Sequence, residues 1–450
     1  MWKQLNILYS PINSSSMTTT DLIIIGSGPG GYRAADYAAK NGLQVLVFEE
    51  QEVGGTCLNS GCIPTKCLAH DASKETIPAF ELVMERKQQT IQQLREGVQT
   101  LLSQPNITLV RGKAVFKDSH TVVANGEEYQ AKHIIIATGS HAKMPPIEGL
   151  VYQQGGESNV MTSTELLNID HVPEKLCIVG AGVIGMEFAS AFASFGSKVT
   201  VVEFMKECLP TLDSDIAKRL RKCMEKNGIE FYLQAGVKCI HQGKVTFERK
   251  GKEQTVEADT ILIATGRAAN MDSLNLDVMG IAYDKKGILV DDNMETSING
   301  IYAIGDTNGR QMLAHAATFQ GFRAVNHILG KSDNIRFDIM PAAVFTLPEA
   351  ASVGKTEDAC KAEELNYTVR KGYYRANGRA LSMEEPEGMA KLIVDEQNKI
   401  IGCHIYGAHA AELVQEISAL MNMDITLDRL MDIIHTHPTL GEILQDMAIG

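Results

Sequence analysis

Residues 21–31 of the chain read DLIIIGSGPGG, and residues 176–187 read LCIVGAGVIGME. Each stretch is a short apolar run that predicts a buried strand, followed by a glycine turn and the start of a helix. In such a turn the first glycine permits a tight bend, the second lets the backbone approach a pyrophosphate, and the third lets the helix pack closely on the strand. The spaced glycines are Gly26, Gly28 and Gly31 in the first turn and Gly180, Gly182 and Gly185 in the second.

Both copies continue into a second strand that ends in an acidic residue. The strand QVLVFE ends at Glu49 and the strand KVTVVE ends at Glu203, each 23 positions after the first glycine of its copy. A carboxylate in this place can accept hydrogen bonds from an adenosine ribose. A single glycine turn would be weak evidence, because ordinary strand–helix turns are also rich in glycine. Two complete copies favour two dinucleotide sites.

Later segments repeat this duplication. IIIATGS (134–140) and ILIATGR (261–267) each predict a buried strand that stops at a glycine, Gly139 or Gly266, where a dinucleotide can lie across the strand end. The run IYAIGDTNG places Asp306 at the end of a further strand.

We therefore predict an α/β fold with two Rossmann-like dinucleotide-binding domains and a C-terminal α+β domain. From Phe337 onward the nucleotide pattern stops, MAKLIVD predicts a strand, AAELVQEISALMN a helix and ITLDRLMDII a final helix. This last region is a candidate subunit interface. The predicted limits are a disordered extension at 1–16, the first dinucleotide-binding domain at 17–149 and 271–336, the second at 150–270, and the interface (dimerisation) domain at 337–450.

Composition excludes several classes of protein. The 450 residues include 42 Lys and Arg and 55 Asp and Glu, for a formal charge of -13, without a long basic run, so nucleic acid is not an expected partner. The apolar runs fall short of the roughly 20 residues that cross a bilayer, so no membrane association is predicted. Nine cysteines, an odd number without a convincing secretory signal, indicate a reducing cytoplasmic location rather than a secreted disulfide framework.

The segment GGTCLNSGCIPTK (54–66) contains Cys57 and Cys62, separated by four residues. If a helix begins here, its dipole and free N–H groups lower the pKa of a thiol and favour the thiolate, which exchanges with disulfides. Such a pair could close a small redox-active disulfide. The remaining cysteines are interpreted as ordinary thiols: Cys67, Cys177, Cys208, Cys223, Cys239, Cys360 and Cys403.

The segment HTHPTLGE (435–442) contains two histidines and a glutamate near the C-terminus. An imidazole can move protons between thiols near neutral pH, and a carboxylate can orient it and stabilise its charged form. We interpret His437 and Glu442 as an acid–base pair and His435 as a packed histidine. Metal binding by the two histidines is the rival interpretation, but no third ligand stands at the usual spacing, so no metal is predicted.

Over nearly all of residues 21–450 the sequence resembles the class I pyridine nucleotide–disulfide oxidoreductase family, and within it the dihydrolipoamide dehydrogenase branch. The motifs GSGPGG, GGTCLNSGCIPTK, GAGVIGMEFA, IYAIGDTNGRQMLAH, PAAVFTLPEAASVG and HTHPTLGE occur in the order that the family has. The resemblance implies an enzyme that oxidises dihydrolipoyl groups, carried by 2-oxoacid dehydrogenase complexes or the glycine cleavage system, with NAD+ as acceptor. The alternatives are an NAD(P)H-dependent reductase of another small-molecule or protein disulfide and a docking subunit of a multienzyme complex.

The resemblance also implies roles for particular residues. Cys57 would exchange with substrate, Cys62 would face the flavin, and His437 with Glu442 would act from the other subunit of a homodimer. Glu203 is followed by FMKE rather than by arginines, which favours NAD over NADPH. FAD would contact Gly26, Gly28, Gly31, Glu49 and Asp306, NAD would contact Gly180, Gly182, Gly185 and Glu203, and Lys66 beside the flavin would pair with Glu187.

Overall fold

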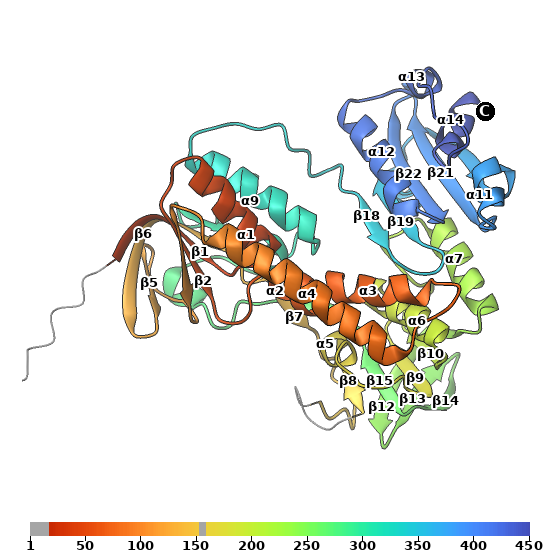
Figure 1. Cartoon of the computed structure of the whole chain (residues 1–450), viewed down its shortest axis with the longest axis horizontal. Coiled ribbons are helices and arrows are strands. Elements are labelled where there is room, and N and C mark those ends of the chain that lie inside the picture. The colour runs from red at the N-terminus through yellow and green to blue at the C-terminus, as the bar shows by residue number, and fades with distance from the viewer. Residues whose placement is uncertain (1–17, 153–158) are drawn as a thin grey trace, which may run out of the picture. The chain divides into compact units, whose positions relative to one another are not determined.

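The computed structural model describes residues 18–152 and 159–450 (Figure 1). The disordered extension predicted for residues 1–16 lies outside the described residues. The described chain divides into two compact units. This division does not test the domain limits given above, which remain a prediction. The first unit contains residues 18–53, 98–139 and 269–332, and the second contains 54–97, 140–268 and 333–450.

The first unit is built on one sheet. Its strands are β1 (Thr18–Ile25), β2 (Val45–Glu49), β3 (Ile107–Arg111), β4 (Val115–Asp118), β5 (Thr121–Ala124), β6 (Glu127–Ile136) and β17 (Ile301–Ala303). They lie in the order β3-β2-β1-β6-β5-β4, and β17 also pairs with β6. The strands β1, β2, β3, β6 and β17 are parallel, whereas β4 and β5 form an antiparallel extension. The short helix α8 (Leu276–Met279) also belongs to this unit.

Two helices of the first unit, α1 (Pro29–Lys40) and α9 (Ala314–Ile328), pack side by side (Figure 1). Small residues on both helices make this close approach possible. A Cβ on Gly30 of α1 would lie 3.2 Å from Ala317 Cβ of α9, and one on Gly321 of α9 would lie 3.1 Å from Ala34 Cβ of α1. Larger side chains at these positions would push the helices apart, because packed interiors leave little free space.

The second unit begins with the helices α2 (Gly55–Ser60) and α3 (Cys62–Ala72) and the start of α4 (Phe80–Leu102). A parallel sheet follows in the order β11-β10-β9-β15-β8. Its strands are β8 (Val160–Met161), β9 (Lys175–Val179), β10 (Lys198–Glu203), β11 (Glu230–Leu233) and β15 (Thr260–Ile263). Its other elements are β7 (Ser140–Ala142), β16 (Arg267–Ala269), α5 (Ser163–Leu166), α6 (Val183–Phe195), α7 (Ser214–Lys226) and the antiparallel β12 (Ala235–His241), β13 (Lys244–Arg249) and β14 (Lys252–Glu257).

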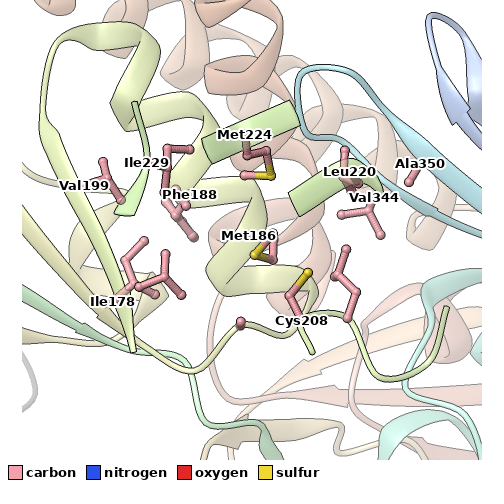
Figure 2. Packing of buried hydrophobic residues seen from close by; sticks show 14 of the residues in the cluster. Ile178, Met186, Phe188, Val199, Cys208, Leu220, Met224, Ile229, Val344 and Ala350 are labelled. Atoms are coloured by element: carbon pink, nitrogen blue, oxygen red, sulfur yellow. The ribbon is translucent and has the colours of Figure 1, made fainter. Parts of the chain in front are cut away.

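The helix α6 lies in the hydrophobic core of this unit (Figure 2). Phe188 on α6 is buried among Ile178 of β9, Val199 of β10 and Met224 of α7. Strands covered on both faces need continuous apolar runs, and β9 and β10 have them in LCIV and VTVV. The prediction of two Rossmann-like domains is therefore confirmed, and each domain has its own parallel sheet.

The C-terminal part of the second unit has an antiparallel sheet in the order β18-β19-β22-β21-β20. Its strands are β18 (Ala342–Val344), β19 (Ala350–Gly354), β20 (Tyr367–Tyr373), β21 (Gly388–Asp395) and β22 (Ile400–Gly407). The helix α12 (Ala410–Asn422) packs on β19 and β22, and α14 (Glu442–Ile449) packs on β20 and β21. The shorter helices are α10 (Glu357–Ala362), α11 (Gly378–Ser382) and α13 (Leu427–Met431).

The helix predicted for AAELVQEISALMN is confirmed as α12, but the prediction of a final helix over ITLDRLMDII is wrong. The helix in that stretch, α13, covers only Leu427–Met431, and a further helix, α14, follows it. The intervening loop contains Pro438, which lacks the N–H group that helix propagation requires. Across residues 18–152 and 159–450, no helix is both long and apolar enough to cross a membrane.

Candidate active site

The two glycine turns have matching geometry. Gly26 and Gly180 have φ angles of 105° and 106°, a conformation that favours glycine. A Cβ on Gly26 would lie 2.3 Å from Ala137 O, and one on Gly180 would lie 2.4 Å from Ala264 O. No other residue type fits either position without moving the backbone of the neighbouring strand.

The second and third glycines also match between the copies. A Cβ on Gly31 would lie 1.9 Å from the carbonyl oxygen of its own turn, and one on Gly185 would lie 2.1 Å from the equivalent oxygen. The helices α1 and α6 start after Gly28 and Gly182, and the described residues provide neither a side-chain cap nor an acidic residue in the first turn of either helix. Their first N–H groups are therefore suited to an anion, and the turns fit the pyrophosphate of a dinucleotide.

The two strand-end acids are held by main-chain donors on either side. Glu49 accepts hydrogen bonds from the Ser27 N–H and hydroxyl at 2.9 and 2.7 Å, and from the N–H two residues later at 2.8 Å. Glu203 accepts in the same way from the N–H of Ala181 and from the N–H two residues later, at 2.7 Å. A carboxylate has about four lone-pair sites, so each acid retains capacity for a ribose hydroxyl.

Further predicted contact residues lie at the same sheet edges. In the first unit Gly26, Gly139 and Asp306 follow the carboxyl ends of the parallel strands β1, β6 and β17. In the second unit Gly180 and Gly266 follow β9 and β15 in the same way. Ligands of open parallel sheets bind at the carboxyl ends of the strands, so both edges fit dinucleotides.

Cys57 lies in α2, and Cys62 is the first residue of α3. Both thiols are half-buried, and neither is in a disulfide. Gly61 makes the tight connection between the two helices, since a Cβ there would lie 2.8 Å from Thr56 O. The helix start that the sequence analysis predicted as a source of thiolate stabilisation is thus located at Cys62.

The two thiols have opposite electrostatic environments. The Cys57 thiol donates a hydrogen bond to the Cys62 sulfur. This hydrogen bond and the nearby Lys66 cation lower the pKa of Cys62 to about 7. The same hydrogen bond, together with burial, raises the pKa of Cys57. In the reduced pair, Cys62 is therefore the thiolate and Cys57 the thiol. The roles of the two residues toward substrate and flavin stay a prediction.

This difference can be measured in the reduced protein. We expect thiolate absorbance to appear with a midpoint near pH 7, because the folded protein lowers the pKa of Cys62 below its ordinary value. The Cys57→Ala variant lacks the donated hydrogen bond, so its midpoint should move upward. The Cys223→Ser variant, which replaces a thiol outside the pair, serves as the control. A Cys57→Ala midpoint at or below the parental one would contradict the assignment.

The cation near Cys62 belongs to a partly buried ion pair. Lys66 Nζ lies 2.9 and 2.8 Å from the two carboxylate oxygens of Glu187, whose side chain is only 3% exposed. Glu187 also accepts a hydrogen bond from Phe345 N at 2.9 Å, and Lys66 Nζ lies 4.9 Å from the centroid of the Phe345 ring. Lys66 lies one helical turn after Cys62 in α3. Its ion pair with Glu187 and its contact with the aromatic ring hold the cation in place.

Two further residues that support this site carry no signal in the sequence that predicts their role. Phe345 appeared only within the motif PAAVFTLPEAASVG, although its N–H group orients Glu187. Arg95 of α4 donates to Asn59 Oδ1 from two nitrogens, at 3.1 and 2.9 Å, and so holds the segment between the cysteines. Arg95 stands on a long polar helix with no local pattern that marks it.

His437 and Glu442, predicted as a pair, are in contact. His437 Nδ1 lies 2.8 Å from Glu442 Oε1, and the Thr439 N–H donates to Glu442 Oε2 at 2.8 Å. The Thr439 N–H and the His437 ring lower the pKa of Glu442, so the carboxyl is ionised. The His437 side chain is 80% exposed, and its Nδ1 contact leaves Nε2 available for proton transfer. The catalytic role of the pair stays a prediction.

The neighbouring His435 has a different environment, with a side chain only 7% exposed. Its Nε2 lies 2.8 Å from Glu416 Oε1 and its Nδ1 lies 3.0 Å from Ile433 O. Both nitrogens are thus engaged within the protein. In the part of the chain that the structure describes, no group of three or more His, Cys, Asp or Glu side chains is arranged to hold a metal ion.

Comparison with known proteins identifies the class that these features define. Residues 20–321 match the family model of pyridine nucleotide-disulphide oxidoreductases, and residues 340–448 match the dimerisation domain of the same family. The chain belongs to the pyridine nucleotide-disulphide oxidoreductase family. Membership, together with the relatives below, implies the cofactors FAD and NAD(H).

Among curated relatives, the chain is 37% identical to the mitochondrial dihydrolipoyl dehydrogenase of Pisum sativum, over 97% of this chain and 92% of the relative. It is 38% identical to the dihydrolipoyl dehydrogenase of Staphylococcus aureus, over 95% and 96%, and 38% identical to leghemoglobin reductase of Glycine max, over 97% and 88%. Among solved structures, the HOCl-induced flavoprotein disulfide reductase RclA from Escherichia coli has a TM-score of 0.87 at 32% identity, covering 95% of this chain and 99% of that one.

Proposed function

We propose that this protein is a dihydrolipoyl dehydrogenase, which oxidises protein-bound dihydrolipoyl groups through Cys57 and Cys62 with FAD as cofactor and NAD+ as acceptor. The observation that carries the proposal is the polarised cysteine pair, in which Cys62 is a stabilised thiolate at a helix N-terminus. Two complete dinucleotide turns in the same chain and relatives named dihydrolipoyl dehydrogenase support it.

The chemistry begins with the disulfide form of the cysteine pair. A dihydrolipoyl thiolate attacks the Cys57 sulfur, a mixed disulfide forms, and the Cys57–Cys62 bond breaks with Cys62 leaving as the thiolate. The low pKa of Cys62 makes it a good leaving group. The second lipoyl thiol then attacks the substrate sulfur of the mixed disulfide, which closes the lipoyl disulfide and releases Cys57.

Proton transfer and charge stabilisation come from other side chains of the protein. His437, oriented by Glu442, accepts the proton of the first substrate thiol, gives it to Cys57 when that sulfur is released, and takes up the proton of the second substrate thiol. Lys66 stabilises the Cys62 thiolate, and its own charge is balanced by Glu187. The reduced cysteine pair now holds two electrons. FAD, held by the first glycine turn and Glu49, would supply the acceptor for this electron pair and the hydride that reduces NAD+.

The proposal includes a homodimer, in which His437 of one subunit serves the cysteine pair of the other. The match of residues 340–448 to a dimerisation domain supports this arrangement. The expected partners are lipoyl-bearing proteins of 2-oxoacid dehydrogenase or glycine cleavage systems. A reducing cytoplasmic location fits the described cysteines, which are all free thiols.

The direct test is the oxidation of dihydrolipoamide by the purified, FAD-loaded protein. We expect NADH to form from NAD+ and dihydrolipoamide, with NADP+ a much poorer acceptor because Glu203 disfavours a 2′-phosphate. A folded, flavin-loaded protein that produced no NADH would refute the proposal.

The second candidate is a reductase of another disulfide, which the similarity to the E. coli flavoprotein disulfide reductase favours. The two candidates share the cysteine chemistry and differ in substrate. Turnover of lipoamide, glutathione disulfide and other small disulfides, each with NADH and with NADPH, separates them. A clear preference for a disulfide other than lipoamide would favour this second candidate.

A substitution at Gly182 tests the second nucleotide turn without disturbing the fold. No described atom lies within 4 Å of the position of a Cβ on Gly182, and its φ of -74° suits any residue. The Gly182→Ala variant should therefore keep the parental melting temperature. Its affinity for NAD+ should fall about 10-fold or more, because a methyl group would occupy the space through which the pyrophosphate approaches.

The matched control for this prediction is Gly378→Ala. Gly378 begins the short helix α11, and no described atom lies within 4 Å of its Cβ position either. This variant should keep both parental stability and parental NAD+ affinity, measured by calorimetry. Unchanged NAD+ affinity in Gly182→Ala would place the nucleotide elsewhere.

A further inference from the structure

The loop between α13 and α14 carries His437 and has no regular secondary structure. Since His437 is 80% exposed, packing around its own ring does little to fix its position. A cavity of about 470 Å³ borders the same loop, lined by residues that include Leu420, Ile434 and Thr436. The position of the His437 ring therefore depends on side-chain hydrogen bonds that hold the loop on either side of it.

After His437 the loop is held by three contacts. Glu442 binds the His437 ring and the Thr439 N–H. Asn377 Nδ2 donates to Thr439 O at 3.0 Å. This half of the loop is thus tied to the start of α14 and to the segment before α11.

In the part of the loop before His437, His435 makes the contact with helix α12. Its Nε2 lies 2.8 Å from Glu416 on α12, and its Nδ1 lies 3.0 Å from Ile433 O. Gln445 Nε2 also donates to Ile433 O, at 3.1 Å. The helix α12 packs its apolar face on the C-terminal sheet, so the backbone that carries Glu416 is fixed in place.

The partners of His435 constrain its protons. A carboxylate oxygen and a carbonyl oxygen are both acceptors, so both hydrogen bonds form only when both ring nitrogens carry a proton. The pair is then an imidazolium bound to a carboxylate, a charge-assisted hydrogen bond that is stronger than a neutral one. His437 differs, because among the described residues its ring is bound through Nδ1 alone, to Glu442.

We propose that His435 and Glu416 form a positioning pair that holds the loop so that the His437 ring is presented in its working orientation. The proposal rests on the proposed function only in naming His437 as the base. The pair itself takes no proton from substrate. Its loss should lower the rate of thiol oxidation, because a shift of about 1 Å in a reacting group can cost about 100-fold in rate.

The experiment compares His435→Asn, Glu416→Gln and the double variant, as full-length, FAD-loaded protein. Dihydrolipoamide oxidation needs the base, whereas NADH oxidation by an artificial dye does not. We expect His435→Asn to lower kcat for dihydrolipoamide about 10-fold or more, with parental dye reduction and parental KM for NAD+. Glu416→Gln should have a smaller effect, because its amide oxygen still accepts a hydrogen bond.

Two further comparisons separate positioning from simple destabilisation. The double variant should lose no more than His435→Asn alone, because residues that act as one unit are not additive. Glu412→Gln, which removes an exposed charge from the same helix, should behave as the parent. Equal losses in the dihydrolipoamide and dye reactions, or parental kcat in His435→Asn, would overturn the proposal.

A substrate-free measurement makes failure of this proposal distinguishable from failure of the proposed function. In protein labelled with ¹⁵N-histidine, both ring nitrogens of His435 should have the chemical shifts of protonated nitrogens. His435→Asn should shift the His437 ring signals, and Glu412→Gln should not. An unprotonated nitrogen on His435, or unchanged His437 signals in His435→Asn, would overturn the positioning pair whatever the substrate is.

Discussion

Replacement of Cys62 by serine is expected to abolish dihydrolipoamide-dependent NAD+ reduction, lowering turnover by at least about 10³-fold. A serine hydroxyl cannot close a disulfide with Cys57 and cannot leave as a stabilised anion near neutral pH. Neither of the two sulfur exchange steps can then be completed. The nucleotide turns lie on other segments of the chain, so the variant should still bind FAD and NAD(H).

The measurement is steady-state NADH formation beside NADH oxidation by a dye in the same preparation. The dye reaction bypasses the cysteine pair and should persist in Cys62→Ser. Cys223→Ser is the matched control, since Cys223 is a half-buried thiol outside the pair, and it should keep both activities. Substantial dihydrolipoamide oxidation by Cys62→Ser would remove the cysteine pair from the mechanism.

The second large effect is expected at His437. His437→Gln should slow dihydrolipoamide oxidation by about 100-fold or more, which is the usual contribution of a general base. The glutamine can still contact Glu442, but it cannot take up a proton. Glu442→Gln should also reduce the rate, because the Glu442 carboxylate stabilises the charged ring and selects its tautomer.

His171→Gln provides a matched control for this substitution. His171 is also exposed, and its Nδ1 lies 2.6 Å from Asp170, so it is a histidine–carboxylate pair without a proposed role. Its substitution should leave the rate unchanged. If His437→Gln oxidised dihydrolipoamide at the parental rate, another group would have to be the base.

The local geometry of the dinucleotide turns was predictable from sequence because it depends on residues close together in the chain. Gly26 and Gly31 are constrained by atoms of their own turn and of the adjacent strand, so their spacing encodes the bend and the helix contact. Helix α12 was predicted for the same reason, from its own apolar periodicity. The final helix was predicted wrongly, because the pattern of ITLDRLMDII extends past the point where the chain leaves α13.

Contacts across long sequence separations were not predictable from the residues themselves. The Lys66–Glu187 pair joins residues 121 positions apart, and it came from family resemblance rather than from any local pattern. Nothing in the sequence marked the Phe345 N–H as the group that orients Glu187, because every residue except proline carries a main-chain N–H. The pairing of His435 with Glu416 was missed because neither residue lies in a pattern that includes the other.

By itself the sequence predicted the two Rossmann-like domains, the candidate redox cysteines and the pairing of His437 with Glu442, because each depends on short-range spacing and backbone sterics. Tertiary structure alone decided which thiol of the pair is the thiolate and that Glu416 pairs with His435. Those properties follow from burial and from the distances between charges, and both arise only when segments far apart in the chain pack together.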